Sequence, residues 1–137
     1  MQMEQTVTGI VAHNDREVLE VTVCGDSLVH VVARPVAAVA SKASQPWMLS
    51  EETSCPKAPF QFSQSGDVST LTTSSLIVTL SAREGSLSFK TAAGESLLRE
   101  DPSLPRSYDP GQSATLYQIK ERFTPDATEA IYGLGQH

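Results

Sequence analysis

Carboxylates are the side chains of this sequence that could catalyse a hydrolysis. A close pair of them can cleave a glycosidic bond, one acting as acid and the other as base or nucleophile. The candidate carboxylates all fall in predicted turns or loops, where acidic residues usually supply solubility and turn hydrogen bonds. We therefore expect no catalytic pair among them. They are Asp26, Asp67, Glu95, Asp101 and Asp109.

Other catalytic and cofactor motifs are missing from the sequence. The histidines are far apart at His13, His30 and His137, and a single strand histidine is more often structural than a general base. No Gly-x-Ser-x-Gly motif is present, and Gly133-Leu-Gly lacks the third glycine and the βαβ context of a dinucleotide-binding loop. No Cys-x-x-Cys or histidine-rich spacing indicates a metal site. We assign no catalytic, cofactor-binding or metal-binding residue and expect no cofactor.

Two aromatic residues could bind a sugar by stacking against its ring. Trp47 is the single tryptophan and lies in the irregular segment Gln45-Pro-Trp-Met, and Tyr108 lies in a predicted loop. A tryptophan in a loop either covers the end of a core or presents a platform to a sugar, and the first interpretation is favoured. Trp47 and Tyr108 are candidate substrate-binding residues only if the chain is a free-standing carbohydrate-binding module.

The two cysteines, Cys24 and Cys55, leave two interpretations open. They could form one disulfide. Cys24 lies in an apolar strand-like run, however, and Cys55 in a proline-rich loop, so two separate thiols are the favoured prediction.

Period-two alternation of apolar residues predicts strands in the first part of the chain. Residues 6–12, 18–24 and 27–34 each show this pattern, with turn signals between them. They are expected to form an antiparallel meander. The third of these strands is apolar on both faces, so we expect it to be central in its sheet.

The remaining elements follow an irregular middle segment. Residues 36–44 could form a short helix after Pro35, and 45–59 are predicted to be an irregular surface excursion. About eight or nine short strands with almost no helix predict an all-β chain folded as an antiparallel β-sandwich. Further strands are predicted at 60–63, 68–73, 76–82, 87–91, 97–98 and 114–124, with turns at Glu84-Gly85 and 93–95 and a loop at 101–113.

Composition limits the classes of protein that this chain can belong to. Its 137 residues, 39% of them apolar, are enough for one domain with a core. A net charge of −6 with scattered basic residues argues against a nucleic-acid partner. No apolar run approaches the roughly 20 residues that a membrane span needs, so no membrane partner is expected. Residues 1–5 lack the features of a signal peptide, so the compartment stays unknown.

In the run from Leu71 to Glu100, a threonine and an apolar strand are followed by a turn, Leu-Ser-Phe, a glycine and Leu-Leu-Arg-Glu. This progression resembles that of the N-terminal domains of glycoside hydrolase family 31, which includes α-glucosidases and α-xylosidases. The tail from Phe123 to His137, with Tyr-Gly-Leu-Gly-Gln, and the strand end Val31-Val-Ala-Arg-Pro are also similar to the family. Residues 36–59 match least.

The resemblance implies a galactose-mutarotase-like N-terminal β-sandwich domain, truncated, spanning 1–137. In that family a (β/α)₈ barrel follows and supplies both catalytic aspartates of a retaining mechanism. This chain would then be a non-catalytic accessory domain that packs on the barrel and helps shape its substrate pocket. Its partners would be the barrel and, through the parent enzyme, carbohydrate.

Three further expectations accompany this interpretation. The specialised ending Tyr132-Gly-Leu-Gly-Gln-His predicts that the chain is a piece of a longer protein. Open sheet edges would then favour a homodimer of the isolated chain. The alternative functions are a carbohydrate-binding module and an immunoglobulin-like interaction domain, and the second is disfavoured because Trp47 lies in a loop and not in a strand.

Overall fold

The computed structural model describes residues 1–38, 55–111, 117–126 and 128–129. Within these residues the chain forms eleven strands and one short 3-10 helix, so the prediction of an all-β antiparallel fold is confirmed. None of the helical structure described there has the length or the hydropathy to cross a membrane. The elements are β1 (Gln2–Gln5), β2 (Gly9–His13), β3 (Glu17–Gly25), β4 (Leu28–Pro35), η1 (Val36–Ala38), β5 (Gln61–Ser65), β6 (Val68–Thr72), β7 (Leu76–Ser81), β8 (Leu87–Thr91), β9 (Ser96–Arg99), β10 (Arg106–Pro110) and β11 (Tyr117–Glu121).

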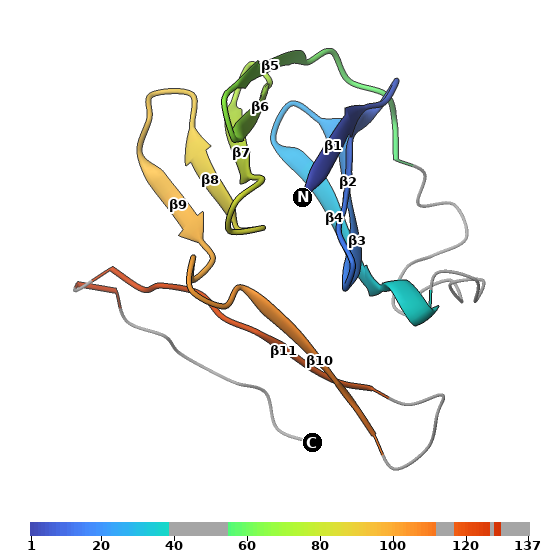
Figure 1. Cartoon of the computed structure of the whole chain (residues 1–137). Helices are drawn as coiled ribbons and strands as arrows, with labels where there is room; N and C mark the ends of the chain where they lie inside the picture. Colours follow the sequence, from blue (N-terminus) through green and yellow to red (C-terminus); the bar gives the residue numbers. More distant parts are fainter. Residues whose placement is uncertain (39–54, 112–116, 127, 130–137) are drawn as a thin grey trace.

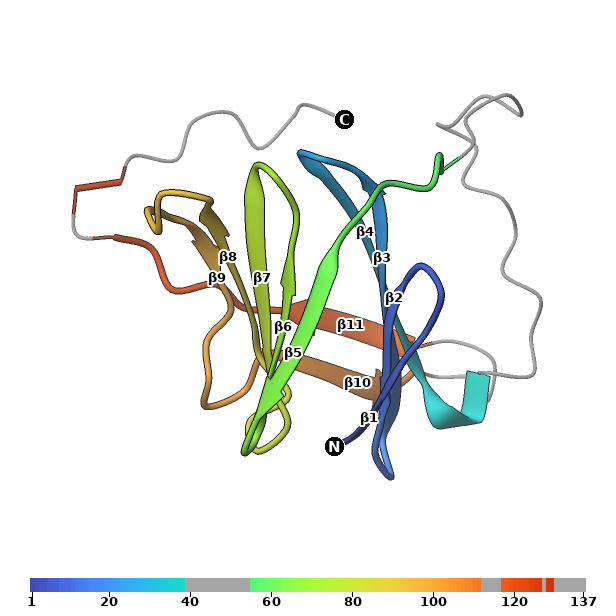
Figure 2. The same ribbon diagram turned by 90° about the horizontal axis from the view of Figure 1, so that it is seen from above.

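The strands form two antiparallel meanders and a separate hairpin. One sheet has the order β1-β2-β3-β4 and the other the order β5-β6-β7-β8-β9. The two sheets face each other as the layers of a sandwich (Figure 1). The β10–β11 hairpin lies across one end of both sheets (Figures 1 and 2). This hairpin closes the end of the sandwich where the candidate site lies.

The first meander differs from its prediction in two respects. Residues 6–8 are a turn, in which the Thr6 amide donates to the Gly9 carbonyl at 2.9 Å, and the strand begins only at Gly9. A Cβ at Gly9 would lie 1.8 Å from the Val21 carbonyl oxygen, so this close approach of β2 to β3 requires glycine. The unpredicted strand β1 lies beside β2.

The prediction that residues 27–34 form a central strand is wrong. Strand β4 is an edge of its sheet and pairs within the described residues only with β3. Both faces of β4 carry apolar side chains, but only one face packs against the core. Val29, Val31 and Ala33 pack against the core, whereas Leu28 on the other face is 58% exposed.

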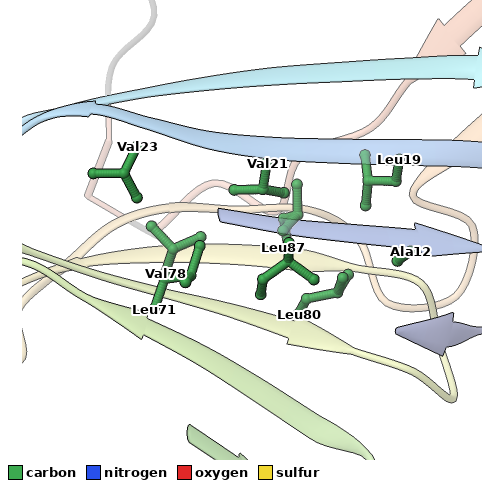
Figure 3. Packing of buried hydrophobic residues seen from close by; sticks show 9 residues of the cluster. Ala12, Leu19, Val21, Val23, Leu71, Val78, Leu80 and Leu87 are labelled. Atoms are coloured by element: carbon green, nitrogen blue, oxygen red, sulfur yellow. The ribbon is translucent and has the colours of Figure 1, made fainter. Parts of the chain in front are cut away.

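The core lies between the two sheets and follows the alternation of the strands. Leu19, Val21 and Val23 form one inward row on β3 and are at most 1% exposed. Figure 3 shows this row pointing toward side chains of the opposite sheet. Glu17 begins the same row, so β3 carries a buried carboxylate at the end of the core. The facing residues are Leu71 on β6, Val78 and Leu80 on β7, and Leu87 on β8.

Strands and turns of the second sheet agree with the alternation pattern. The predicted turns contain Gly85 and Gly94, whose φ angles of 71° and 90° are readily adopted only by glycine. The prediction of a loop over 101–113 is wrong, because Arg106–Pro110 is strand β10. Prolines at both ends of this segment conceal it, although a proline is tolerated at strand ends and in edge strands.

Part of the predicted middle segment lies outside the described residues. Of the helix expected over 36–44, residues 36–38 form the 3-10 helix η1, and residues 39–44 are not described. Trp47 and most of the excursion at 45–59 are also outside, as are residues 114–116 of the strand expected over 114–124.

The prediction of two separate thiols is wrong, because Cys24 and Cys55 form a disulfide with a Cα–Cα distance of 4.6 Å. Cys24 lies at the end of β3 in the first sheet, and Cys55 precedes β5 of the second. The pairing joins residues 31 positions apart. The pairing of Cys24 with Cys55 depends on how the two sheets pack against each other, so local sequence patterns do not predict it.

Candidate functional site

A cluster of buried charged side chains lies where the β10–β11 hairpin meets the sandwich. It contains Glu17 from the start of β3, Arg106 from the start of β10, and Glu100, which directly follows β9. The side chains of Glu17, Glu100 and Arg106 are 9%, 1% and 4% exposed. The cluster therefore joins both sheets and the hairpin through charges that are almost fully removed from water.

The Arg106 guanidinium is the centre of the cluster. Its Nε donates to Oε2 of Glu17 at 3.0 Å and its Nη2 to Oε1 at 2.9 Å, which is a bidentate ion pair. Nη1 donates to Oε1 of Glu100. Nη2 also donates to the Gly85 carbonyl oxygen at 2.5 Å. Arg106 thus contacts three separate segments of the sandwich.

The two carboxylates also accept hydrogen bonds from donors other than Arg106. The Tyr108 hydroxyl donates to Oε2 of Glu17 at 2.7 Å. The Leu87 amide donates to Oε2 of Glu100 at 2.6 Å. Every oxygen of the two carboxylates therefore accepts a hydrogen bond, as buried charges require if burial is not to be prohibitively costly.

The environment changes the pKa of two cluster members. Burial alone would lower the pKa of the Arg106 guanidinium, but hydrogen bonds and charges from Glu17 and Glu100 outweigh burial, so the pKa is raised. Burial, and then the hydrogen bond to Glu17, raise the pKa of the Tyr108 phenol. Arg106 stays charged and Tyr108 stays a hydrogen-bond donor at any physiological pH.

A third carboxylate, Glu121, lies beside the cluster. It is the cross-strand partner of Arg106 in the hairpin. Burial raises the pKa of Glu121, and a hydrogen bond to Glu100 and the negative charge of Glu100 raise it further, against a smaller opposite effect of Arg106. Three carboxylates around one guanidinium leave excess negative charge, which protonation of Glu121 relieves.

We predict that Glu121→Gln stabilises the chain at pH 7. The folded state raises the pKa of Glu121 above its unfolded value, so between these two pKa values the folded chain binds more protons than the unfolded chain. The chain therefore loses stability as the pH rises through this range. The neutral glutamine removes this loss, by no more than about 1 kcal/mol because Glu121 is only partly buried and solvent screens its charge.

Denaturant unfolding between pH 4 and pH 8 measures this effect, since the difference between variant and wild type should grow with pH. Glu4→Gln, an exposed carboxylate on β1, is the matched control and should show no such growth. A Glu121→Gln curve parallel to wild type across the range would contradict the prediction.

A cavity of about 690 Å³ adjoins the cluster. Its wall is formed by the β2–β3 turn, the end of β4 with η1, the β7–β8 turn, the loop 102–105 and the hairpin. Glu17, Arg106 and Tyr108 are part of this wall, so the buried cluster forms one side of the cavity. Acidic and basic residues from both turns also line it, namely Asp15, Arg16, Arg83 and Glu84.

The candidate residues predicted from the sequence do not form one cluster in the structure. Tyr108 lies on β10 and lines the cavity, whereas Trp47 is outside the described residues. His13 and His30 are exposed on separate strands. Asp109 forms an exposed ion pair with Lys120 at 3.4 Å.

The other loop carboxylates behave as turn residues. Hydrogen bonds from the Ser103 hydroxyl and amide lower the pKa of Asp101, while Asp26, Asp67 and Glu95 are exposed.

Sequence reasoning missed Glu17, Glu100 and Arg106. Glu17 could have been found, because it continues the inward row of Leu19 and Val21 on β3. An acidic residue in such a row needs a buried cationic partner. Nothing local indicates that this partner is Arg106, which is 89 residues away.

The geometry of the cluster is that of a joint between segments and not of a hydrolytic pair. Both carboxylates already use all their oxygens, and Glu100 is almost completely buried, so neither can reach a glycosidic oxygen. Among the residues that the structure describes, no three histidine, cysteine, aspartate or glutamate side chains are grouped to hold a metal ion.

Comparison with protein families gives one match over most of the chain. The model described as "Glycosyl hydrolase 31 N-terminal galactose mutarotase-like domain" matches residues 18–137. The match includes all the residues of the buried cluster except Glu17, which immediately precedes it.

Two solved structures share the fold. A GH31 alpha-xylosidase from Xanthomonas citri has a TM-score of 0.79 and 24% sequence identity over 97% of this chain. A GH31 alpha-xylosidase from a soil metagenome, complexed with xylose, has a TM-score of 0.77 and 21% identity over 100% of this chain. The matches span only 14% and 22% of the length of those proteins. At these identities the likeness establishes a common fold.

Proposed function

The chain belongs to the glycosyl hydrolase 31 N-terminal galactose mutarotase-like domain family, and on this premise we propose that it is a non-catalytic accessory domain of an α-glycosidase. Its role is to pack on the catalytic (β/α)₈ barrel and to help shape the barrel's substrate pocket. The parent enzyme would be a retaining hydrolase of the α-xylosidase or α-glucosidase type.

The observation that carries this proposal is the share of the related enzymes that the fold occupies. The same fold accounts for 14% of one alpha-xylosidase and 22% of another. Those proteins therefore contain a large further part against which such a domain can pack. The best-placed carboxylates of this chain, Glu17 and Glu100, are bound to Arg106, which agrees with a supporting role.

The hairpin supports the same proposal, because it is poorly covered for an element with apolar side chains. Ile119 on β11 is 63% exposed and Phe123, just beyond it, is 42% exposed. Leu97 on the edge strand β9 is 53% exposed. A neighbouring domain packed against β9 and β11 would remove this apolar surface from water.

Reconstitution from two separately produced parts tests the accessory role. One part is this chain, and the other is the catalytic remainder of the enzyme that contains it. We expect no hydrolysis of aryl α-xylosides or α-glucosides by the chain alone. We expect 1:1 binding to the remainder and a gain in its kcat/KM of about tenfold or more, because small misplacements at a pocket are costly in rate. Turnover by the chain alone, or a remainder that neither binds the chain nor responds to it, contradicts the proposal.

A homodimer of the isolated chain is a second partner that its open edges favour. Strands β1, β4 and β5 are sheet edges within the described residues, and unpaired edges invite pairing with another copy. This stays a prediction, and light scattering after size-exclusion chromatography measures it directly.

A further inference from the structure

One face of the β10–β11 hairpin carries its two tyrosines, and both of them border the cavity. Tyr108 pairs with Ile119 across the hairpin, and Tyr117 lies two residues before Ile119, so the three side chains share a face. The Tyr108 hydroxyl reaches Glu17 on β3, so Tyr108 points toward the sandwich, whereas Ile119 beside it is 63% exposed. Both tyrosines line the cavity described above.

The Tyr108 ring is held in place without a ligand. Its backbone is in the hairpin ladder opposite Ile119, and its hydroxyl is bonded to Glu17 at 2.7 Å. Glu17 is itself fixed by the bidentate contact of Arg106. A ring that is already immobilised loses little conformational entropy when a ligand stacks on it, so affinity is gained at low cost.

The rim of the cavity supplies hydrogen-bonding groups of both kinds. Asp15 and Arg16 come from the β2–β3 turn, and Arg83 and Glu84 from the β7–β8 turn. Carboxylates only accept and guanidinium groups only donate, so a ligand here must do both. Each turn contributes one charge of each sign, so the two turns together add no net charge to the rim.

From the tyrosine face and this mixed rim, we propose that the cavity beneath the β10–β11 hairpin binds a neutral sugar in its pyranose form. The C–H face of the ring stacks on Tyr117, which lines the cavity together with the fixed ring of Tyr108, and the hydroxyls bond to the rim. The volume of about 690 Å³ lies in the range of small-molecule sites and holds one or a few sugar units. This proposal does not depend on the accessory role proposed above.

Titration of the ¹⁵N-labelled 137-residue chain with D-xylose, followed by NMR, tests the proposal. We expect saturable shifts of the Arg16, Arg83 and Ser107 amides with a Kd on the order of millimolar, as for a small polar ligand. Glycerol has hydroxyls but no ring face, and should cause no saturable shift at these amides.

Three variants separate stacking and rim contacts from a general effect on folding. Tyr117→Ala should weaken binding at least about tenfold, whereas Phe123→Ala, which removes an exposed aromatic outside the cavity wall, should leave the Kd unchanged. Arg83→Ala alters only the exposed rim and should weaken binding about threefold or more.

Several results would overturn the proposal. They are the absence of saturable shifts with D-xylose, equal Kd values for Tyr117→Ala and Phe123→Ala, and shifts located outside the cavity wall. If the wall amides respond to the catalytic remainder of the enzyme and not to sugar, the cavity is an interdomain contact and the sugar site is wrong. That outcome leaves the accessory role intact, so the two proposals fail independently.

Discussion

Replacing Arg106 with methionine is expected to lower the free energy of unfolding by about 3–5 kcal/mol, because it leaves two buried carboxylates without their cation. The guanidinium is 4% exposed and contacts Glu17, Glu100 and the Gly85 carbonyl. Methionine keeps much of the volume of arginine but donates no hydrogen bond. Removing one partner of a buried network costs far more than the intact network contributes, since the remaining charges stay desolvated.

Arg34→Met is the matched control for this variant. Arg34 pairs with Glu20 at 3.0 Å, but the two side chains are 29% and 39% exposed. Solvent screens this pair, so its loss should cost less than about 1 kcal/mol. Denaturant unfolding of both variants at pH 7 gives the comparison. Equal losses for Arg106→Met and Arg34→Met would show that the cluster does not join the hairpin to the sandwich.

A triple variant decides whether the cost comes from uncompensated charge. When Arg106→Met is combined with Glu17→Gln and Glu100→Gln, the buried charges are gone and much of the lost stability should return. Hydrogen exchange adds a local readout. Amides of the β10–β11 ladder should lose protection in Arg106→Met before those of β3 and β7, because the hairpin has few buried apolar side chains of its own.

The extent to which the sequence predicts this fold depends on the range of the interactions. Alternation is a local signal, and it indicates β3, β7 and β8 because their inward rows are largely apolar. Edge position is not local, which is why β4 looks central although it has one partner in the described residues. Strand β10 is hidden for a related reason, since its pairing with β11 outweighs the prolines around it.

The candidate site was less predictable than the fold, since it is made of contacts between distant segments. Tyr108 was singled out as an aromatic platform, but its hydroxyl contact with Glu17 crosses 91 residues. Glu100 follows Leu97-Leu98, and nothing in that short run distinguishes it from a surface acid. Only the closure of the sandwich end by the hairpin brings Glu17, Glu100 and Arg106 together.

The disulfide gives the second large expected effect. Replacing Cys24 and Cys55 with alanine should lower the free energy of unfolding by about 3–4 kcal/mol, since the bond closes a loop between residues 31 positions apart and restricts the unfolded chain. The bond also joins the end of β3 to the segment entering β5, so its loss releases one connection between the sheets. A loss of this size is a large part of the stability of a small domain.

Guanidinium unfolding with and without dithiothreitol separates this effect from side-chain packing. Reductant should destabilise the wild type nearly as much as the double substitution does and should leave the double variant unchanged. Cys24 is 4% exposed, so the alanine at that position adds a small packing cost that the reduced wild type does not have. A wild-type stability that does not respond to full reduction of the bond would contradict the loop-closure account. It would mean that the contacts between the sheets hold residues 24 and 55 together without the covalent link.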